Sequence, residues 1–145
     1  MMKNKDLYQA LMNLQCELVA ERNLVNPGKI SWLQYDILNA LQEHSSKPTV
    51  LSRQLGITQA KLSKNFTKLR DLGYISQTPD IHDHREIMTE ITDNGIKFMN
   101  GIAEKHNQLY SLAKAIWTKE EQEQFILSAN KLIAILKKER LKNEK

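Results

Sequence analysis

The residues best suited to chemistry lie in one basic segment, from His44 to Arg70. Six lysines and arginines occur there without any aspartate or glutamate: Lys47, Arg53, Lys61, Lys64, Lys68 and Arg70. Taking these six from the 21 lysines and arginines of the chain leaves 15, against 17 aspartates and glutamates. The rest of the chain is therefore close to neutral. Positive charge this local favours a polyanionic partner over a general role in solubility.

A lysine stripe lies along the helix predicted over residues 58–72. Lys61, Lys64 and Lys68 are spaced i, i+3 and i+7, so they share one face of this helix. Three apolar residues share another face: Leu62, Phe66 and Leu69. A lysine stripe is usually a solvated helix face, but this one follows a capped helix and a glycine turn in a segment without acidic residues. That context favours a recognition helix whose lysines contact phosphates.

Three smaller side chains on the same helix are suited to the edges of bases. Gln59 and Ala60 lie in its first turn, where a recognition helix meets the major groove. Ser63 is short enough to allow close approach. We therefore expect base contacts from these three residues.

Capping residues and helix breakers place the elements around this helix. Helices are predicted over residues 5–23, 31–43, 49–55, 58–72 and 92–116, with a last helix from 118 to about 136. Ser31 and Gln34 form a capping box, and Thr49 is predicted to cap the third helix. Two antiparallel strands, 74–78 and 86–91, are predicted around a polar tip, which makes a wing. The charged end from 137 to 145 is expected to fray.

The first helix is apolar on two faces. One face carries Leu7, Leu11, Leu14 and Leu18, and the other carries Tyr8, Met12, Cys16 and Val19. A chain of 145 residues has few elements with which to enclose such a helix. A partner subunit is the simplest cover, and burial within one chain is the alternative.

Composition bounds the fold class and the location. With 41% hydrophobic residues, five glycines and three prolines, the chain is too hydrophobic for disorder and has too few turn residues for a sandwich or barrel. No apolar run approaches the roughly 18 residues of a membrane span, and residues 1–10 lack the apolar core of a secretory signal. We expect a cytoplasmic protein without a membrane partner.

The predicted fold is a single domain, residues 1–145, that is mainly α with a small β-hairpin wing. A winged helix-turn-helix DNA-binding region, 30–92, lies between dimerisation helices at 1–25 and 93–145.

Three motifs in this order resemble the MarR family of bacterial winged-helix regulators. They are Leu-Arg-Asp-Leu-Gly-Tyr-Ile at 69–75, Asp-His-Arg at 83–85 and Ile-Thr-Asp-Asn-Gly at 91–95. The resemblance covers nearly the whole chain. It departs at Ser76 and Gln77, where family wings often carry an arginine. It implies a homodimer whose first and last two helices interleave. The recognition helices of the two subunits would enter successive major grooves of a pseudo-palindromic operator. In the family, DNA binding is often controlled by a small ligand or by oxidation of a cysteine.

The wing and the helix before the stripe complete the expected DNA-binding set. We assign Arg85 to the minor groove, where a narrow A·T-rich groove concentrates negative potential, and Asp83 to orienting its guanidinium. Arg53 is assigned to DNA together with the stripe.

Cys16 is the only cysteine, which excludes an intramolecular disulfide and a cysteine-rich zinc site. Its place in the first helix is similar to that in the peroxide-sensing branch of the family, where a thiolate is oxidised to sulfenic acid. Residues 17–31 hold no tyrosine to support it, and Trp32 stands where one is expected. A small buried apolar side chain is the alternative role of Cys16.

Histidines give weaker signals. In His82-Asp83-His84, the two imidazoles could bind a metal as a pair. No third ligand is in view, so we prefer to interpret these residues as solvated wing residues, and no metal is expected. His106 could line a ligand pocket near Tyr110, although an ordinary helical histidine is the simpler interpretation.

Two other function classes fit the sequence less well. The chain contains no nucleophile elbow, P-loop, dinucleotide fingerprint or zinc-protease helix, so neither an enzyme nor a cofactor is expected. A winged helix that serves as a protein-interaction module, without specific DNA binding, is the alternative to a regulator.

Overall fold

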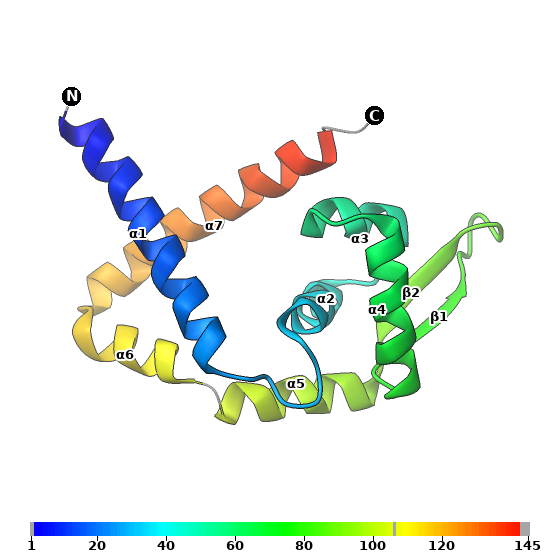
Figure 1. The fold of residues 1–145 in the computed structure, drawn as a ribbon. Helices are drawn as coiled ribbons and strands as arrows, with labels where there is room; N and C mark the ends of the chain where they lie inside the picture. Colours follow the sequence, from blue (N-terminus) through cyan, green and yellow to red (C-terminus); the bar gives the residue numbers. More distant parts are fainter. Residues whose placement is uncertain (1, 106, 143–145) are drawn as a thin grey trace.

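The computed structural model describes residues 2–105 and 107–142. The elements follow in the order α1 (Met2–Leu24), α2 (Trp32–Glu43), α3 (Pro48–Leu55), α4 (Gln59–Asp71), β1 (Ile75–Pro79), β2 (Ile87–Ile91), α5 (Asp93–Lys105), α6 (Gln108–Ile116) and α7 (Lys119–Lys142). In Figure 1, α2 to α5 and the hairpin form one body, and α1, α6 and α7 form an arm beside it. The mainly α fold with a two-stranded wing is confirmed.

The hydrophobic core lies entirely within the body. Its buried residues come from the segment before α2, from α2 to α5 and from the start of the wing: Ile30, Ile37, Leu38, Leu41, Leu51, Leu62, Phe66, Leu69, Tyr74, Ile75, Met99 and Ile102. Tyr74 also stacks on Phe98, with ring centroids 4.6 Å apart. Because α3 and α4 bury one face each in this core, their other faces stay outside.

Local capping rules explain most helix ends. Ser31 accepts a hydrogen bond from the Gln34 amide and Gln34 accepts one from the Ser31 amide, which is the predicted capping box. Thr58 accepts from the Lys61 amide at 3.1 Å, and Thr118 and Glu121 form a second box. Gly56 takes the left-handed conformation (φ 69°) that ends α3 and turns the chain into α4.

Three expectations about the helices were wrong. Thr49 does not cap α3, because Pro48 occupies the first helical turn, where it needs no amide hydrogen bond, and Lys47 becomes the N-cap residue. The helix predicted over 92–116 is divided into α5 and α6, since Asn107 leaves the helical conformation (φ −104°, ψ 17°). Of the end expected to fray, residues 137–142 instead continue α7, and 143–145 lie outside the described residues.

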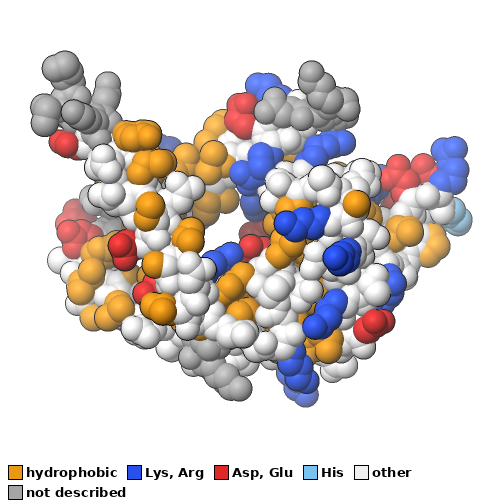
Figure 2. Space-filling view, viewed as in Figure 1, with side chains coloured by type: hydrophobic (Ala, Val, Ile, Leu, Met, Phe, Trp, Pro, Cys, Tyr) orange, Lys and Arg blue, Asp and Glu red, His pale blue; other side chains and the backbone are white. Residues whose placement is uncertain are grey.

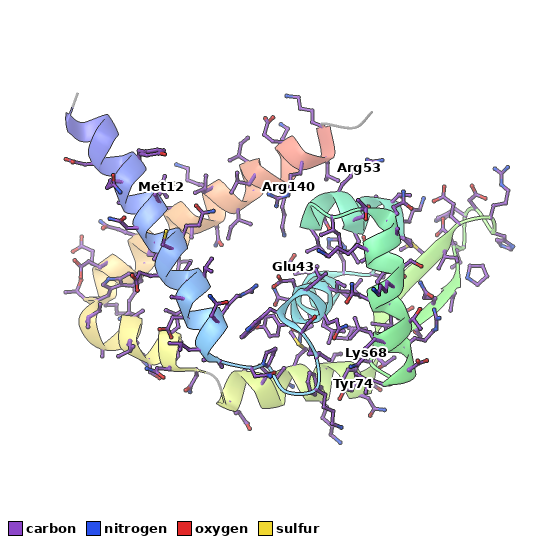
Figure 3. The ribbon with its side chains drawn as sticks, viewed as in Figure 1. Met12, Glu43, Arg53, Lys68, Tyr74 and Arg140 are labelled. Carbon is purple, nitrogen blue, oxygen red and sulfur yellow. The ribbon has the colours of Figure 1, made fainter. Side chains whose placement is uncertain are left out.

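The end of α7 is held because it reaches the body. The Arg140 Nε donates to the Gln54 carbonyl oxygen at 2.8 Å, and Lys137 pairs with Glu43 at 3.4 Å. The Gln54 carbonyl lies in the last turn of α3, where helix carbonyls lack partners within the helix. Figure 3 shows Arg140 and Glu43 on the facing sides of the gap between α7 and the body.

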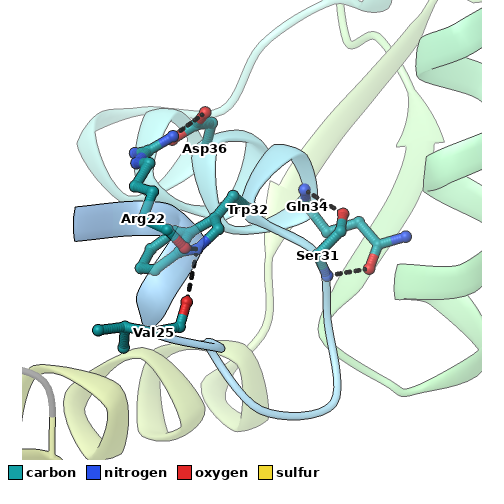
Figure 4. A network of polar contacts seen from close by, with 6 residues as sticks. All are labelled: Arg22, Val25, Ser31, Trp32, Gln34 and Asp36. Atoms are coloured by element: carbon teal, nitrogen blue, oxygen red, sulfur yellow. Dashed lines mark hydrogen bonds and ion pairs between the residues drawn. The ribbon is translucent and has the colours of Figure 1, made fainter. Parts of the chain in front are cut away.

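The arm joins the body at the start of α2. Arg22 makes a two-pronged ion pair with Asp36, at 2.8 and 3.0 Å, and its guanidinium lies 4.7 Å from the centre of the Trp32 ring. The indole Nε1 of Trp32 donates to the carbonyl oxygens of Arg22 (2.8 Å) and Val25 (2.9 Å), as Figure 4 shows in part. These contacts fix the end of α1 against α2.

Within the described residues, no helix is long and apolar enough to cross a membrane.

Candidate nucleic-acid interface

The two faces of α4 separate apolar from basic side chains as predicted. Leu62, Phe66 and Leu69 are buried, at 4% exposure or less. The lysine stripe, Lys61, Lys64 and Lys68, is exposed on the other side. Figure 2 shows basic side chains spread over this face of the body, with little acidic surface between them. The geometry presents positive charge to a ligand that lies along α4.

The residues predicted to meet base edges also lie outside. Gln59, Ala60 and Ser63 are all exposed, and Gln59 and Ala60 form the first turn behind the Thr58 cap. The capped start of α4 leaves their side chains unobstructed by the core. The structure therefore brings these three residues and the stripe together on one surface.

Helix α4 is anchored by a residue that sequence reasoning missed. Asn65 accepts a hydrogen bond from the Gln34 side-chain amide at 2.9 Å and donates to the Lys61 carbonyl at 2.8 Å. Gln34 is the same side chain that closes the capping box of α2 (Figure 4), and it is buried. This buried polar link fixes the start of α2 to the middle of α4. The local sequence signal for Gln34 was only its role as a cap.

Other members of the basic segment are engaged elsewhere. The Arg70 Nη1 donates to Gln77 at 2.6 Å, and Gln77 donates to the Thr89 hydroxyl at 3.1 Å. Gln77, which stands where the family often has arginine, thus ties α4 to both wing strands. Lys47 faces the wing rather than the stripe, pairing with Glu86 at 3.0 Å.

Arg53 lies apart from the stripe. It is half-buried in α3. Figure 3 places it beside the C-terminal end of α7, whereas Lys68 lies toward the opposite end of α4. The assignment of Arg53 to DNA stays a prediction.

The wing presents one exposed cation at its tip. The hairpin pairs Ile75 with Ile91 and Pro79 with Ile87. The side chain of Arg85 is 90% exposed, and the Asp83 carboxylate accepts from its Nε at 3.2 Å.

Asp83 also shapes the tip itself. Its carboxylate accepts from the Arg85 backbone amide at 3.1 Å, which folds the tip locally. The side-chain hydrogen bond from Arg85, helped by the backbone one, lowers the pKa of Asp83 below its ordinary value. The carboxylate therefore stays charged beside the guanidinium.

Cys16 and the histidines follow their predictions only in part. Cys16 is exposed on α1, so the role of a small buried side chain is not realised within the single chain. Residues 2–105 and 107–142 hold no group of three histidine, cysteine or acidic side chains that could bind a metal. His82 and His84 are exposed on the wing, and His106 lies outside the described residues.

Two cavities are lined by helices of the arm. One, of about 370 Å³, lies between α1, α2 and α6 and includes Arg22, Trp32, Tyr35 and Leu109 in its lining. The other, of about 390 Å³, is almost wholly apolar and lies between α1, α6 and α7, with Leu14, Tyr110 and Phe125 among its walls.

Comparison with known proteins agrees with this architecture. Residues 29–86 match the model of the MarR family. The transcriptional repressor MprA of Escherichia coli K12 is 24% identical over 122 residues, which cover 81% of this chain and 69% of MprA.

Solved structures share the fold over most of the chain. The transcriptional regulator BldR from Sulfolobus solfataricus superposes with a TM-score of 0.70 at 19% identity, over 91% of this chain and 95% of BldR. A cysteine-to-serine mutant of E. coli MarR complexed with operator DNA gives 0.64 at 16% identity, over 88% and 95% of the two chains. Bordetella bronchiseptica BpsR, whose DNA binding is regulated by 6-hydroxynicotinic acid, gives 0.63 at 14% identity, over 86% and 90%.

At these identities the superpositions show the fold, and the family match runs from the loop before α2 through the basic helix and β1 to the tip of the wing. The chain is therefore similar to the MarR family over residues 29–86, and it has the fold of E. coli MarR.

Proposed function

We propose that this chain is a sequence-specific DNA-binding transcriptional regulator that acts as a homodimer on a pseudo-palindromic operator. The observation that carries the proposal is the exposed lysine stripe of α4, set opposite a buried apolar face and next to a capped first turn. Lysines neutralise phosphates without reading sequence, and the first turn of such a helix reaches base edges. The relatives support this function, since MprA is a repressor and MarR was solved on operator DNA.

The second subunit is proposed because the arm leaves apolar surface uncovered. Large hydrophobic side chains of α1, α6 and α7 are exposed, including Leu14, Leu109, Ile116, Phe125 and Leu132. Contiguous apolar surface on this scale marks an interaction site. A two-fold dimer would cover it and would present two α4 helices to half-sites about one helical turn apart.

A small-molecule effector is proposed for the 370 Å³ cavity at Arg22 and Trp32. Its walls come from α1 and α6 of the arm and from α2 of the body. A molecule bound there would therefore change the orientation of the arm relative to the body. The regulation of BpsR by 6-hydroxynicotinic acid supports a small-molecule effector. Oxidation of the exposed Cys16 is the alternative trigger.

The test starts from selection of binding sites out of a random-sequence duplex library, followed by fluorescence anisotropy on the selected site across a salt series. Lys64→Ala should flatten the slope of log affinity against log salt by about one unit per subunit, or about two for the dimer, because two phosphate contacts are lost. Lys119→Ala, at the exposed start of α7 remote from α4 in Figure 1, is the matched control and should leave the slope unchanged.

An intact slope in Lys64→Ala would reduce the stripe to a solvated face. Failure to enrich any site, together with salt-independent binding to a protein partner, would favour the interaction module.

A further inference from the structure

The loop between α2 and α3 is joined to the wing by its backbone. The Ser46 amide donates to the Thr89 carbonyl at 3.0 Å, and the Thr89 amide donates to the Ser46 carbonyl at 2.9 Å. Both residues are buried, at 5% and 0% exposure. Pro48 then begins α3. Lys47 therefore extends from a backbone that is held on both sides.

The ammonium group of Lys47 contacts both sides of the wing hairpin, at the end of β1 and at the start of β2. It lies 3.0 Å from a Glu86 carboxylate oxygen and 3.9 Å from an Asp80 carboxylate oxygen. Asp80 directly follows β1, and Glu86 directly precedes β2. The Asp80 amide also donates to the Glu86 carbonyl at 2.8 Å, which closes the tip at the same level. Lys47 thus joins α3 to the base of the tip that carries Arg85.

Charge gives this contact a second effect. The tip holds three carboxylates, Asp80, Asp83 and Glu86, beside the single arginine. The hydrogen bond to Glu86 raises the pKa of Lys47, so its positive charge persists at neutral pH. Without that charge, the carboxylates would repel the phosphates that Arg85 has to approach.

We propose that Lys47 is a positioning residue for the wing, which holds the tip against α3 so that Arg85 enters the minor groove, and is not itself a phosphate contact. The inference rests on the proposed DNA-binding function. It assigns a role to Lys47, which belongs to the basic segment but not to the lysine stripe.

The experiment compares the affinities of the full-length protein for two operators that differ only in A·T or G·C flanks. The ratio of the two affinities isolates the wing, since a general change in charge alters both affinities alike. Lys47→Met and Glu86→Gln should each lower the preference for A·T flanks by about two- to fivefold, the range of an exposed ion pair, and Lys47→Arg should keep it. In an Arg85→Ala background, Lys47→Met should have no further effect on the preference. Lys97→Met, at an exposed position of α5, is the control.

A unit loss of salt slope per subunit in Lys47→Met with an unchanged flank preference would overturn the inference and make Lys47 a phosphate contact. Amide hydrogen exchange of the DNA-free protein gives a readout that does not depend on the proposed function. The Glu86 and Asp80 amides should exchange several-fold faster in Lys47→Met and at the original rate in Lys47→Arg. Unchanged exchange rates in Lys47→Met would refute the positioning role of Lys47 even if no DNA site were found. Faster exchange in a protein that binds no DNA would refute only the proposed DNA-binding function.

Discussion

At the scale of single residues, Arg85 is the side chain whose chemistry depends most on one neighbour. Its guanidinium stands in solvent, yet the Asp83 carboxylate accepts from both its Nε and its backbone amide. A planar guanidinium is less strongly hydrated than an ammonium group, so it enters a narrow groove at a lower cost. The local pair therefore pre-orients the cation that we propose enters the minor groove.

Exchanging this pair gives a prediction about flanking sequence. Arg85→Lys keeps the charge but loses the planar fork, so we expect it to weaken binding most on A·T-flanked operators and little on G·C-flanked ones. Asp83→Ala should show the same dependence more mildly, because it releases the arginine without deleting it. Anisotropy titrations on the paired operators measure both effects. Equal losses on the two operators would make Arg85 an ordinary phosphate contact and leave Asp83 as a turn former.

At the scale of elements, the junction between the wing and α5 depends on close packing. The Thr92 hydroxyl donates to the Gly73 carbonyl at 2.6 Å and accepts from the Gly95 amide at 3.1 Å. A Cβ on Gly95 would clash with the Tyr74 carbonyl oxygen and would lie 2.6 Å from the Ile91 side chain. Only glycine lets the first turn of α5 approach the start of the wing this closely.

Two alanine substitutions in α5 should therefore have opposite signs. Gly95→Ala should lower the free energy of unfolding by about 1–3 kcal/mol, the usual cost of overpacking a tight site. Gly101→Ala, where a Cβ meets nothing within 4 Å, should raise it by up to about 1 kcal/mol through the helix propensity of alanine. Urea unfolding of the two variants beside the unsubstituted protein measures both. A neutral Gly95→Ala would show that α5 can shift away from the wing without loss.

At the scale of the whole molecule, one chain is an incomplete structure. Its core is confined to α2–α5, the wing and the segment before α2, while the described parts of α6 and α7 contribute no buried residue. Both expected stripes of α1 remain largely open, and Leu7 and Tyr8 are each 62% exposed. The proposed dimer would cover this apolar surface of the arm.

A positive charge introduced into the apolar surface of the arm should weaken the dimer. Leu14→Lys puts an ammonium group on the apolar surface of α1, and we expect dimer dissociation at least tenfold easier, because burial of a leucine is worth about 1.5–3 kcal/mol. Asn13→Lys, on the exposed polar face of the same helix beside Gln9, is the control and should leave assembly unchanged. Sedimentation velocity across a concentration series measures both variants. A folded, monodisperse monomer of the unsubstituted protein at micromolar concentration would contradict the dimer.

Features that depend on near neighbours follow directly from the amino-acid sequence. Ser31, Thr58 and Thr118 cap helices, and Gly56 ends one, because each acts through hydrogen bonds or backbone angles within a few residues. The separation of lysines from apolar residues on α4 follows from helical period alone. These local rules were enough to predict the helix-turn-helix, the wing and the basic surface.

Contacts between groups far apart in the sequence become visible only in the packed chain. Gln34 and Asn65 are 31 residues apart and Gln54 and Arg140 are 86 apart, so no spacing rule connects them. Lys47 looked like part of the basic surface, but the Ser46–Thr89 bridge turns it toward the wing acids. The physical reason is that helical and strand periods fix the face of a residue, whereas its partner across the core is chosen by how the whole set of elements packs.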